Sequence, residues 1–218
     1  MIGYRAAWKA IPVTQRWLVG LLAAALLVAN ISQPYATVAP LHHVPTVLLL
    51  LAAPLLLARW PLSTRAVGWT VLFWLLHTLG GRYTYSNVPY DQWAEALTGV
   101  SISEVFGFTR NHYDRLVHFV FGLASVPLVV DALRRHAGAS LAAALWIAVG
   151  FVLAAGSLYE IFEWLLTLAA AGPTADAYNG QQGDIWDPQK DMALAFVGAL
   201  CMIPVEIRRT RRGSCPKQ

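Results

Sequence analysis

The residues from Val47 to Leu57 form an uninterrupted run without a polar side chain. A helix that is apolar on all sides is either buried in a large core or spans a membrane, because a surface helix needs a polar face. The composition decides between the two, since the chain is 57% hydrophobic and only 13% charged, with a mean hydropathy of +0.50. Soluble domains carry about 25% charged residues. The sequence therefore predicts an integral membrane protein.

Six apolar runs approach the length of about 20 residues that a helix needs to cross the hydrocarbon core. The runs are Trp17–Ile31, Val44–Ala58, Ala66–Leu79, Leu116–Leu133, Leu141–Ala170 and Met192–Ile207. The first three are short, so two tilted re-entrant segments are the alternative in that region. The predicted fold class is all-α, a polytopic membrane bundle of about six transmembrane helices, with residues 1–218 as a single membrane domain.

Lys and Arg residues gather in alternate segments between these runs. Twelve of them lie in the N-terminal, second, fourth and C-terminal segments: Arg5, Lys9, Arg16, Arg59, Arg65, Arg134, Arg135, Arg208, Arg209, Arg211, Arg212 and Lys217. The positive-inside rule then places both termini, including a basic tail at residues 208–218, in the cytoplasm of a bacterial cell with an inner membrane. A cleaved signal peptide is the alternative for the first run, but a retained helix is favoured because five more runs follow. The dispersed basic residues also exclude a nucleic-acid stripe.

Ionisable residues at membrane depth are costly unless they are paired or face a polar cavity. In this chain they cluster at the predicted periplasmic ends of four runs: His77, Asp114, Arg115, His118, Glu160, Glu163, Asp187, Lys190 and Asp191. Residues spaced i, i+3 or i, i+4 share a helix face, so the acids and histidines should point together into one pocket. The loops Gly80–His112 and Gly172–Ile185 are expected to roof it, and His42 and His43 are expected to be solvated in the first outer loop.

Three uses of this cluster follow from its residue types. Carboxylates and imidazoles on facing helices suit a divalent metal ion, with a candidate ligand set of His77, Asp114, His118, Glu160, Glu163, Asp187 and Asp191. Glu160 and Glu163 suit catalytic acid–base work. Alternatively, cations could neutralise the acids in a buried ion-pair network of Arg82, Arg110, Arg115, Asp184 and Lys190. No His-Glu-x-x-His or paired Cys-x-x-Cys motif supports a particular metalloenzyme.

Four groups of strings carry a family resemblance. They are His77-Thr78-Leu79-Gly80-Gly81 with Tyr83-Thr84-Tyr85, Arg110-Asn111-His112-Tyr113-Asp114-Arg115 with His118-Phe119, Tyr159-Glu160 with Glu163-Trp164, and Gly183-Asp184-Ile185-Trp186-Asp187 with Gln189-Lys190-Asp191-Met192. From His77 to Gly198 the chain resembles the YjdF-like bacterial inner-membrane proteins, a domain family of unknown function. The resemblance implies a polytopic inner-membrane protein and supplies no reaction. Arg82 departs from it, standing where a His is expected.

A more distant likeness is to VanZ-like proteins, some of which are associated with glycopeptide-antibiotic resistance. It rests on Asp114-Arg115 with His118, on Glu160, and on the spacing of Asp187, Asp191 and Gly198. This second likeness favours cell-envelope lipids or wall precursors as the molecules acted on.

These observations lead to one leading function and two alternatives. The leading hypothesis is an envelope enzyme, metal-dependent or acid–base, or a binding protein for a lipid-linked or amphiphilic molecule, with membrane lipids as its other partners and no nucleic acid. The first alternative is a transporter or channel that uses the buried acids for ion or proton coupling, although the cytoplasmic half is expected to be almost purely apolar. The second is a structural or interaction protein held together by buried ion pairs.

Overall fold

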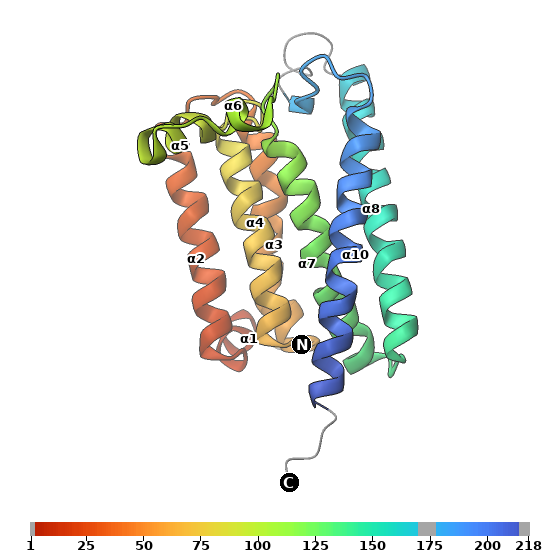
Figure 1. Ribbon diagram of the computed structural model, residues 1–218. Helices are drawn as coiled ribbons and strands as arrows, with labels where there is room; N and C mark the ends of the chain where they lie inside the picture. The colour runs from red at the N-terminus through yellow and green to blue at the C-terminus, as the bar shows by residue number, and fades with distance from the viewer. Residues whose placement is uncertain (1–2, 170–177, 214–218) are drawn as a thin grey trace.

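The computed structural model describes residues 3–169 and 178–213, and no β-strand occurs in these two ranges. Among these residues, six long helices run side by side in alternating directions (Figure 1). They are α2 (Val13–Asn30), α3 (Ala39–Arg59), α4 (Thr64–Arg82), α7 (Tyr113–His136), α8 (Leu141–Ala169) and α10 (Asp187–Gly213). Three short helices complete the described chain: α1 (Tyr4–Ala10), α5 (Tyr90–Thr98) and α6 (Ile102–Phe106).

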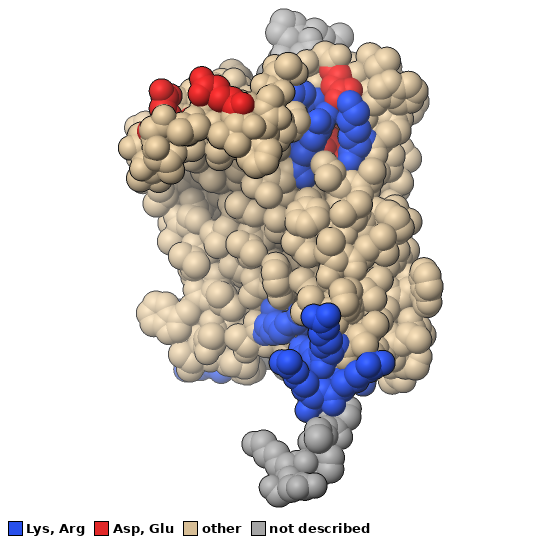
Figure 2. Space-filling model, viewed as in Figure 1, with Lys and Arg blue, Asp and Glu red and all other residues tan. Residues whose placement is uncertain are grey.

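The bundle has two chemically different ends. The start of α1 and the end of α10 lie together at one end, where Lys and Arg side chains gather on the face seen in Figure 2; we call this the basic end. The opposite end carries α5, α6 and the first turns of α7 and α10, and the Asp and Glu side chains visible in Figure 2 lie there. We call it the acidic end. The separation of charge expected from the sequence is therefore present along the bundle.

The helices form two groups of three, each with its own apolar core. In α2, α3 and α4 the core residues include Leu22, Leu57 and Val67, while α7, α8 and α10 enclose a larger cluster that includes Val126 and Ala148. Helix α7 also packs against α4 and so joins the two groups. Half of the most apolar part of α7 is buried, more than in α2, α3 or α8. The helix that carries the central residues of the candidate site is thus held from several sides.

Glycines allow α7 and α10 to approach closely. A Cβ atom at Gly122 would overlap the carbonyl oxygen of Ala195, and one at Gly198 would overlap the carbonyl oxygen of Phe119. Small residues that let helix backbones touch are typical of helix pairs in membranes. This contact fixes the first turn of α10 against that of α7, where the acids lie.

The exterior of the bundle is apolar. Large side chains such as Trp17, Leu27 and Trp146 are between 71% and 76% exposed. Helices α2, α3, α7 and α8 are long and apolar enough to cross a membrane. Each of the six predicted runs coincides with a long helix, and α2, α3 and α4 are continuous helices of 18 to 21 residues rather than re-entrant pieces. The six-span count itself stays a prediction.

Several helices begin earlier than their apolar runs. Helix α3 starts at Ala39 instead of Val44, with Pro40 in its first turn, a position that suits proline because its fixed φ is helical and it lacks an N–H. The first of the two expected roof loops, Gly80–His112, contains the short helices α5 and α6. Residues 170–177, which include the last residue of the fifth apolar run and the first part of the second expected roof loop, lie outside the described residues, as do residues 214–218 of the expected basic tail.

Candidate functional site

Three cations and two acids form an ion-pair cluster at the start of α10. Arg110 Nη1 lies 2.5 Å from Asp187 Oδ1, and Arg115 Nη2 lies 2.5 Å from Asp184 Oδ2. Lys190 Nζ also meets Asp184 Oδ2, at 2.6 Å. Hydrogen bonding from Lys190 holds the pKa of Asp184 at about 2. Asp184 and Asp187 are thus neutralised by ion pairs, as the ion-pair alternative expects, and these two acids engage all three cations.

The neighbouring acids have no such partners. Ligand atoms of Asp114, His118 and Asp191 all lie within 4.8 Å of one another. His118 Nε2 is 3.6 Å from Asp114 Oδ1. Asp191 is 3% exposed, and its Oδ1 has no hydrogen-bond partner among the described residues. The i, i+4 pair on α7 and the acid on α10 converge because the glycine contact brings the two helices together.

Helix α8 contributes two further acids. The buried Oε1 of Glu160 is another atom for which the described residues supply no hydrogen-bond partner. Asp191 and Asp114 are close enough to act on Glu160 electrostatically. Glu163, one turn further along α8, lies within reach of the Tyr159 hydroxyl. Glu160 and Glu163 therefore lie on the side of α8 that faces the group of Asp114, His118 and Asp191, as the sequence predicts.

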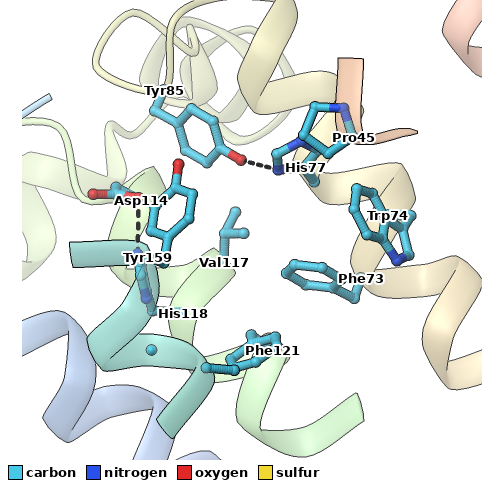
Figure 3. A pocket seen from close by; sticks show the side chains of 12 residues that line it. Pro45, Phe73, Trp74, His77, Tyr85, Asp114, Val117, His118, Phe121 and Tyr159 are labelled. Atoms are coloured by element: carbon cyan, nitrogen blue, oxygen red, sulfur yellow. Dashed lines mark hydrogen bonds and ion pairs between the residues drawn. The ribbon is translucent and has the colours of Figure 1, made fainter. Parts of the chain in front are cut away.

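A cavity of about 240 Å³ opens next to these residues, between the two three-helix groups. Figure 3 shows Asp114 and His118 on one side of it and Tyr85 with His77 on the other. Aromatic and aliphatic side chains form the remaining wall: Pro45, Phe73, Trp74, Val117 and Phe121. The cavity is thus polar at two edges and apolar between them.

His77 does not join the acid group but pairs with Tyr85. Its Nε2 lies 2.8 Å from the backbone oxygen of His42, which can only accept, so Nε2 carries the proton. In the neutral ring Nδ1 is then the acceptor, and the Tyr85 hydroxyl donates to it at 2.5 Å. Burial raises the pKa of Tyr85 well above its usual value, which keeps this donor protonated. Both ring nitrogens of His77 are therefore engaged within the protein.

The turn after α4 is shaped to place Tyr85. Thr84 and Tyr85 both have positive φ, 51° and 55°, a conformation that costs energy for residues other than glycine. A Cβ atom at Gly80 would come within 2.8 Å of the Tyr85 ring. The Gly-Gly and Tyr-Thr-Tyr strings noted in the sequence therefore act together, one leaving the space that the other fills.

The prediction that His42 and His43 are solvated was wrong. They are 1% and 4% exposed, because α3 begins before them and turns them into the bundle. His42 packs against Tyr178, with 4.2 Å between the ring centroids and 45° between the ring planes. His43 Nδ1 lies 3.0 Å from Asn30 Nδ2. A helix boundary placed five residues too late concealed this buried histidine pair.

Arg82 is not brought to the acids. Its Nη1 donates to the backbone oxygens of Ala29 and Ile31 at 2.7 and 2.8 Å. The last carbonyls of a helix lack intrahelical partners, so Arg82 satisfies the end of α2. The sequence alone could not distinguish this capping role from an ion pair.

The comparison with known families agrees with this architecture. The model of the family described as "Predicted membrane protein (DUF2238)" matches residues 14–212. This chain belongs to that family. It is also similar to a protein of Escherichia coli (strain K12) named "Inner membrane protein YjdF", with 36% identity over 148 residues. The matched segment covers 66% of this chain and 66% of that relative. No solved structure matches the chain.

Membership in the DUF2238 family and the similarity to YjdF confirm the YjdF-like resemblance seen in the sequence. With its membrane-spanning helices, the chain is a multi-pass protein of the inner membrane. The family match includes every residue of the acidic-end cluster and of the cavity. The weaker likeness to VanZ-like proteins stays a prediction.

The basic end holds two buried acids that the expectation of an apolar cytoplasmic half overlooked. Glu206 is 0% exposed and pairs with Arg65 and with Arg209, the latter at 3.2 Å. Asp131 is 7% exposed, accepts from the backbone N–H of Ser63 at 2.7 Å and meets an arginine one turn away on α7. Both acids here are neutralised by cations.

Sequence reasoning named most of the residues that converge but missed the tyrosines of the pocket. Tyr159 lines the cavity, and Tyr178 contacts His42 from beyond the end of α8. Burial raises the pKa of Tyr178 to about 12. Tyr159 precedes Glu160 in the sequence, and Tyr178 precedes Asn179 in the second loop. Neither position marks a tyrosine as a pocket residue, because aromatic residues are common throughout a membrane protein.

Proposed function

We propose that the acidic end is a site that holds a divalent cation and an amphiphilic molecule, in an inner-membrane enzyme or binding protein of the bacterial envelope. The observation that carries this proposal is the group formed by Asp114, His118 and Asp191, whose ligand atoms lie within 4.8 Å of one another. The cations of that end are engaged by Asp184 and Asp187 instead. An added cation would supply the missing positive charge.

The proposed orientation has the acidic end in the periplasm and both termini in the cytoplasm. The support is the concentration of Lys and Arg side chains at the basic end (Figure 2), since cytoplasmic segments of inner-membrane proteins are rich in these residues. Reporter fusions test this. A fusion in the α8–α10 connection and one at the C-terminus should report opposite sides of the membrane.

The ligand set suits Zn²⁺ or Mn²⁺. Two carboxylates and one imidazole are ligands that both ions accept, and three protein ligands with an open position are typical of catalytic zinc sites. Asp114, His118 and Asp191 would be the ligands, and the buried Oε1 of Glu160 is the next oxygen available. Asp187 is engaged by Arg110, and His77 by Tyr85, so neither belongs to the proposed ligand set.

Glu160 and Glu163 are proposed as the groups that accept or donate protons next to the cation. Acid–base catalysis needs a carboxyl within reach of the reacting group, and both carboxyls lie within one helical turn of Tyr159. Tyr159, from the same helix, lines that cavity.

The apolar wall of the cavity supports an amphiphilic ligand. Phe73, Trp74 and Phe121 would contact its apolar part, while Asp114 and Tyr85 stand at the polar edges. Sites that are mostly apolar with a few placed polar groups are typical of small-molecule pockets. A cavity of about 240 Å³ holds only part of a lipid, so the rest of such a ligand would extend into the bilayer.

The transporter alternative receives less support. Ion or proton coupling across the membrane would use acids toward both ends, and the acids toward the basic end, Glu206 and Asp131, are paired with arginines. A flux in proteoliposomes that depends on Glu160 would favour transport over the proposed site.

Elemental analysis of the purified full-length chain tests the proposal. The wild type, after exposure to Zn²⁺ and removal of excess, should retain about one ion per chain, and Asp191→Asn and Asp114→Asn should lose it. Glu95→Gln is the matched control, because it removes an exposed acid at the same end of the bundle. A folded wild type that retains no Zn²⁺ or Mn²⁺, or an Asp191→Asn variant that retains as much as wild type, would refute the cation site.

A further inference from the structure

A second hollow lies outside the helix bundle, below the lobe formed by α5 and α6. It is a groove of about 470 Å³ between that lobe and the first turns of α7 and α10. Ile102 and Phe108 come from the lobe side, Leu116 and Phe119 from α7, and Leu194 from α10. It is separate from the cavity of the proposed function.

The cations of the acidic end stand at the polar edge of this groove. Arg115 lines it directly, with Arg110 and Lys190 in the same ion-pair cluster. Counted by themselves, these three cations and the two acids that they meet, Asp184 and Asp187, carry a net charge of +1, and Arg115 is the one of the three that lines the groove. A negatively charged group is therefore favoured at this edge.

Arg115 has donors that the protein does not use fully. Its Nη2 meets Asp184 and Asp187, but its Nε is buried without a hydrogen-bond partner among the described residues. Its Nη1 makes a single long contact of 3.4 Å, to His112 Nε2. A phosphate oxygen would satisfy these donors, since a guanidinium binds phosphate through two parallel hydrogen bonds.

Further along α7 and α10, the sides of these two helices that line the groove are apolar. Arg115 is followed by Phe119 on α7, and Lys190 by Leu194 on α10, each four residues on and therefore about 6 Å deeper along the helix. Leu116, also in the groove, is 47% exposed. The groove thus presents positive charge at headgroup depth and apolar side chains directly beneath it.

We propose that this groove binds one anionic glycerophospholipid from the leaflet at the acidic end, with the phosphate on Arg115 and an acyl chain along Leu116, Phe119 and Leu194. The lobe of α5 and α6 covers the outer side of the chain through Ile102 and Phe108. The groove is a hollow separate from the proposed cation site, and its lining includes none of Asp114, His118 and Asp191.

Native mass spectrometry of the full-length chain, released from nanodiscs that contain equal amounts of phosphatidylglycerol and phosphatidylcholine, tests this proposal. The wild type should retain one phosphatidylglycerol in preference to phosphatidylcholine. Leu116→Trp, which fills the groove, should reduce that retention about tenfold, the effect of losing one well-made contact. Leu153→Trp is the matched control, because it makes the same change on the exposed face of α8.

The role of the phosphate is tested separately with Arg115→Gln, which should abolish the preference for phosphatidylglycerol. Arg115→Gln also breaks the ion pairs of Arg115 with Asp184 and Asp187. If Arg115→Gln does not fold, the Leu116→Trp result alone decides whether the groove binds lipid. Equal lipid retention in Leu116→Trp and wild type would refute the site. Equal retention of the two lipids by wild type would refute its charge selectivity, and a dimer that Leu116→Trp abolishes would assign the groove to a second copy of the chain instead.

Discussion

At the basic end of the bundle Glu206 is fully buried and meets Arg65 and Arg209, whereas at the acidic end Asp191 is almost as deeply buried and meets Asp114 and His118. Burying a carboxylate without a partner is expensive, so a buried acid is ordinarily paired. Near one end of α10 a buried acid is thus paired with arginines, and near the other end a buried acid lies next to another acid and a histidine.

Cations are not scarce at the acidic end. Arg110, Arg115 and Lys190 lie there, and all three are engaged by Asp184 and Asp187. Asp187 and Asp191 are one turn apart on the same helix, yet only Asp187 is neutralised by the protein. Asp191 therefore stays without a cationic partner although cations lie within reach of the same helix turn, as expected of a ligand site and not of a structural clamp.

The largest effect is expected at the basic end. Glu206→Gln should lower the free energy of unfolding by about 3 kcal/mol, because removing one partner of a buried ion pair leaves the other uncompensated. Thermal or denaturant unfolding in detergent measures the change, with the exposed Arg208→Gln as control. Unfolding at the wild-type midpoint would mean that the pairing at this end does not stabilise the bundle.

The second largest effect is expected at the contact between α7 and α10. Gly122→Ala should cost about 2 kcal/mol, since its Cβ would meet the carbonyl of Ala195 and push α10 away from α7. It should also weaken Zn²⁺ retention, because Asp191 would move with α10. Gly150→Ala, at an open position on α8, is the control. A variant as stable as wild type would contradict the close contact of α7 with α10.

The opposite sign is expected for the unpaired acid. In the absence of divalent cations Asp191→Asn should raise the free energy of unfolding by about 1 kcal/mol, because it removes a buried charge next to Asp114. Unfolding in EDTA measures it against Glu95→Gln, for which no change is expected. A loss of stability like that of Glu206→Gln would mean that Asp191, like Glu206, is stabilised by its neighbours in the folded protein.

The smallest effect concerns pH. Interaction with Lys190 and Arg115 lowers the pKa of Asp184 from 3.8 to about 2. An acid with a lowered pKa in the folded state stabilises the protein above its unfolded value and loses this contribution as pH falls through the folded value. The thermal midpoint of wild type should therefore fall between pH 4 and pH 2 more than that of Asp184→Asn. Parallel curves for the two proteins would show that Asp184 contributes nothing.

Much of the fold was predictable because membrane helices are apolar over their whole length. Each apolar run lies in a long helix, and the i, i+4 spacing of Asp114 and His118 predicted a pair that is 3.6 Å apart. The helix ends were less predictable, since Pro40, His42 and His43 interrupt the apolar pattern at the start of α3, and the first turn of α10 is polar. That error hid His42 and His43.

The distribution of ion pairs could not be read from the sequence. Which acid meets an arginine depends on distances between helices, and these follow from contacts such as that of Gly122 with Ala195. Arg82 lies in the sequence beside the same strings as the pocket residues but reaches the end of α2. Glu206 stands at the end of the last apolar run, next to the basic tail, and the sequence does not show that packing buries it.

The most direct test of the unpaired acid group is the thermal midpoint of the cation-free chain with and without added Zn²⁺. Ligand binding to the folded state raises the midpoint, so wild type and Glu206→Gln should both be stabilised, Glu206→Gln from a lower starting value. Asp191→Asn should show no response. An Asp191→Asn variant that responds like wild type, or a wild type that does not respond to Zn²⁺ or Mn²⁺, would contradict the account.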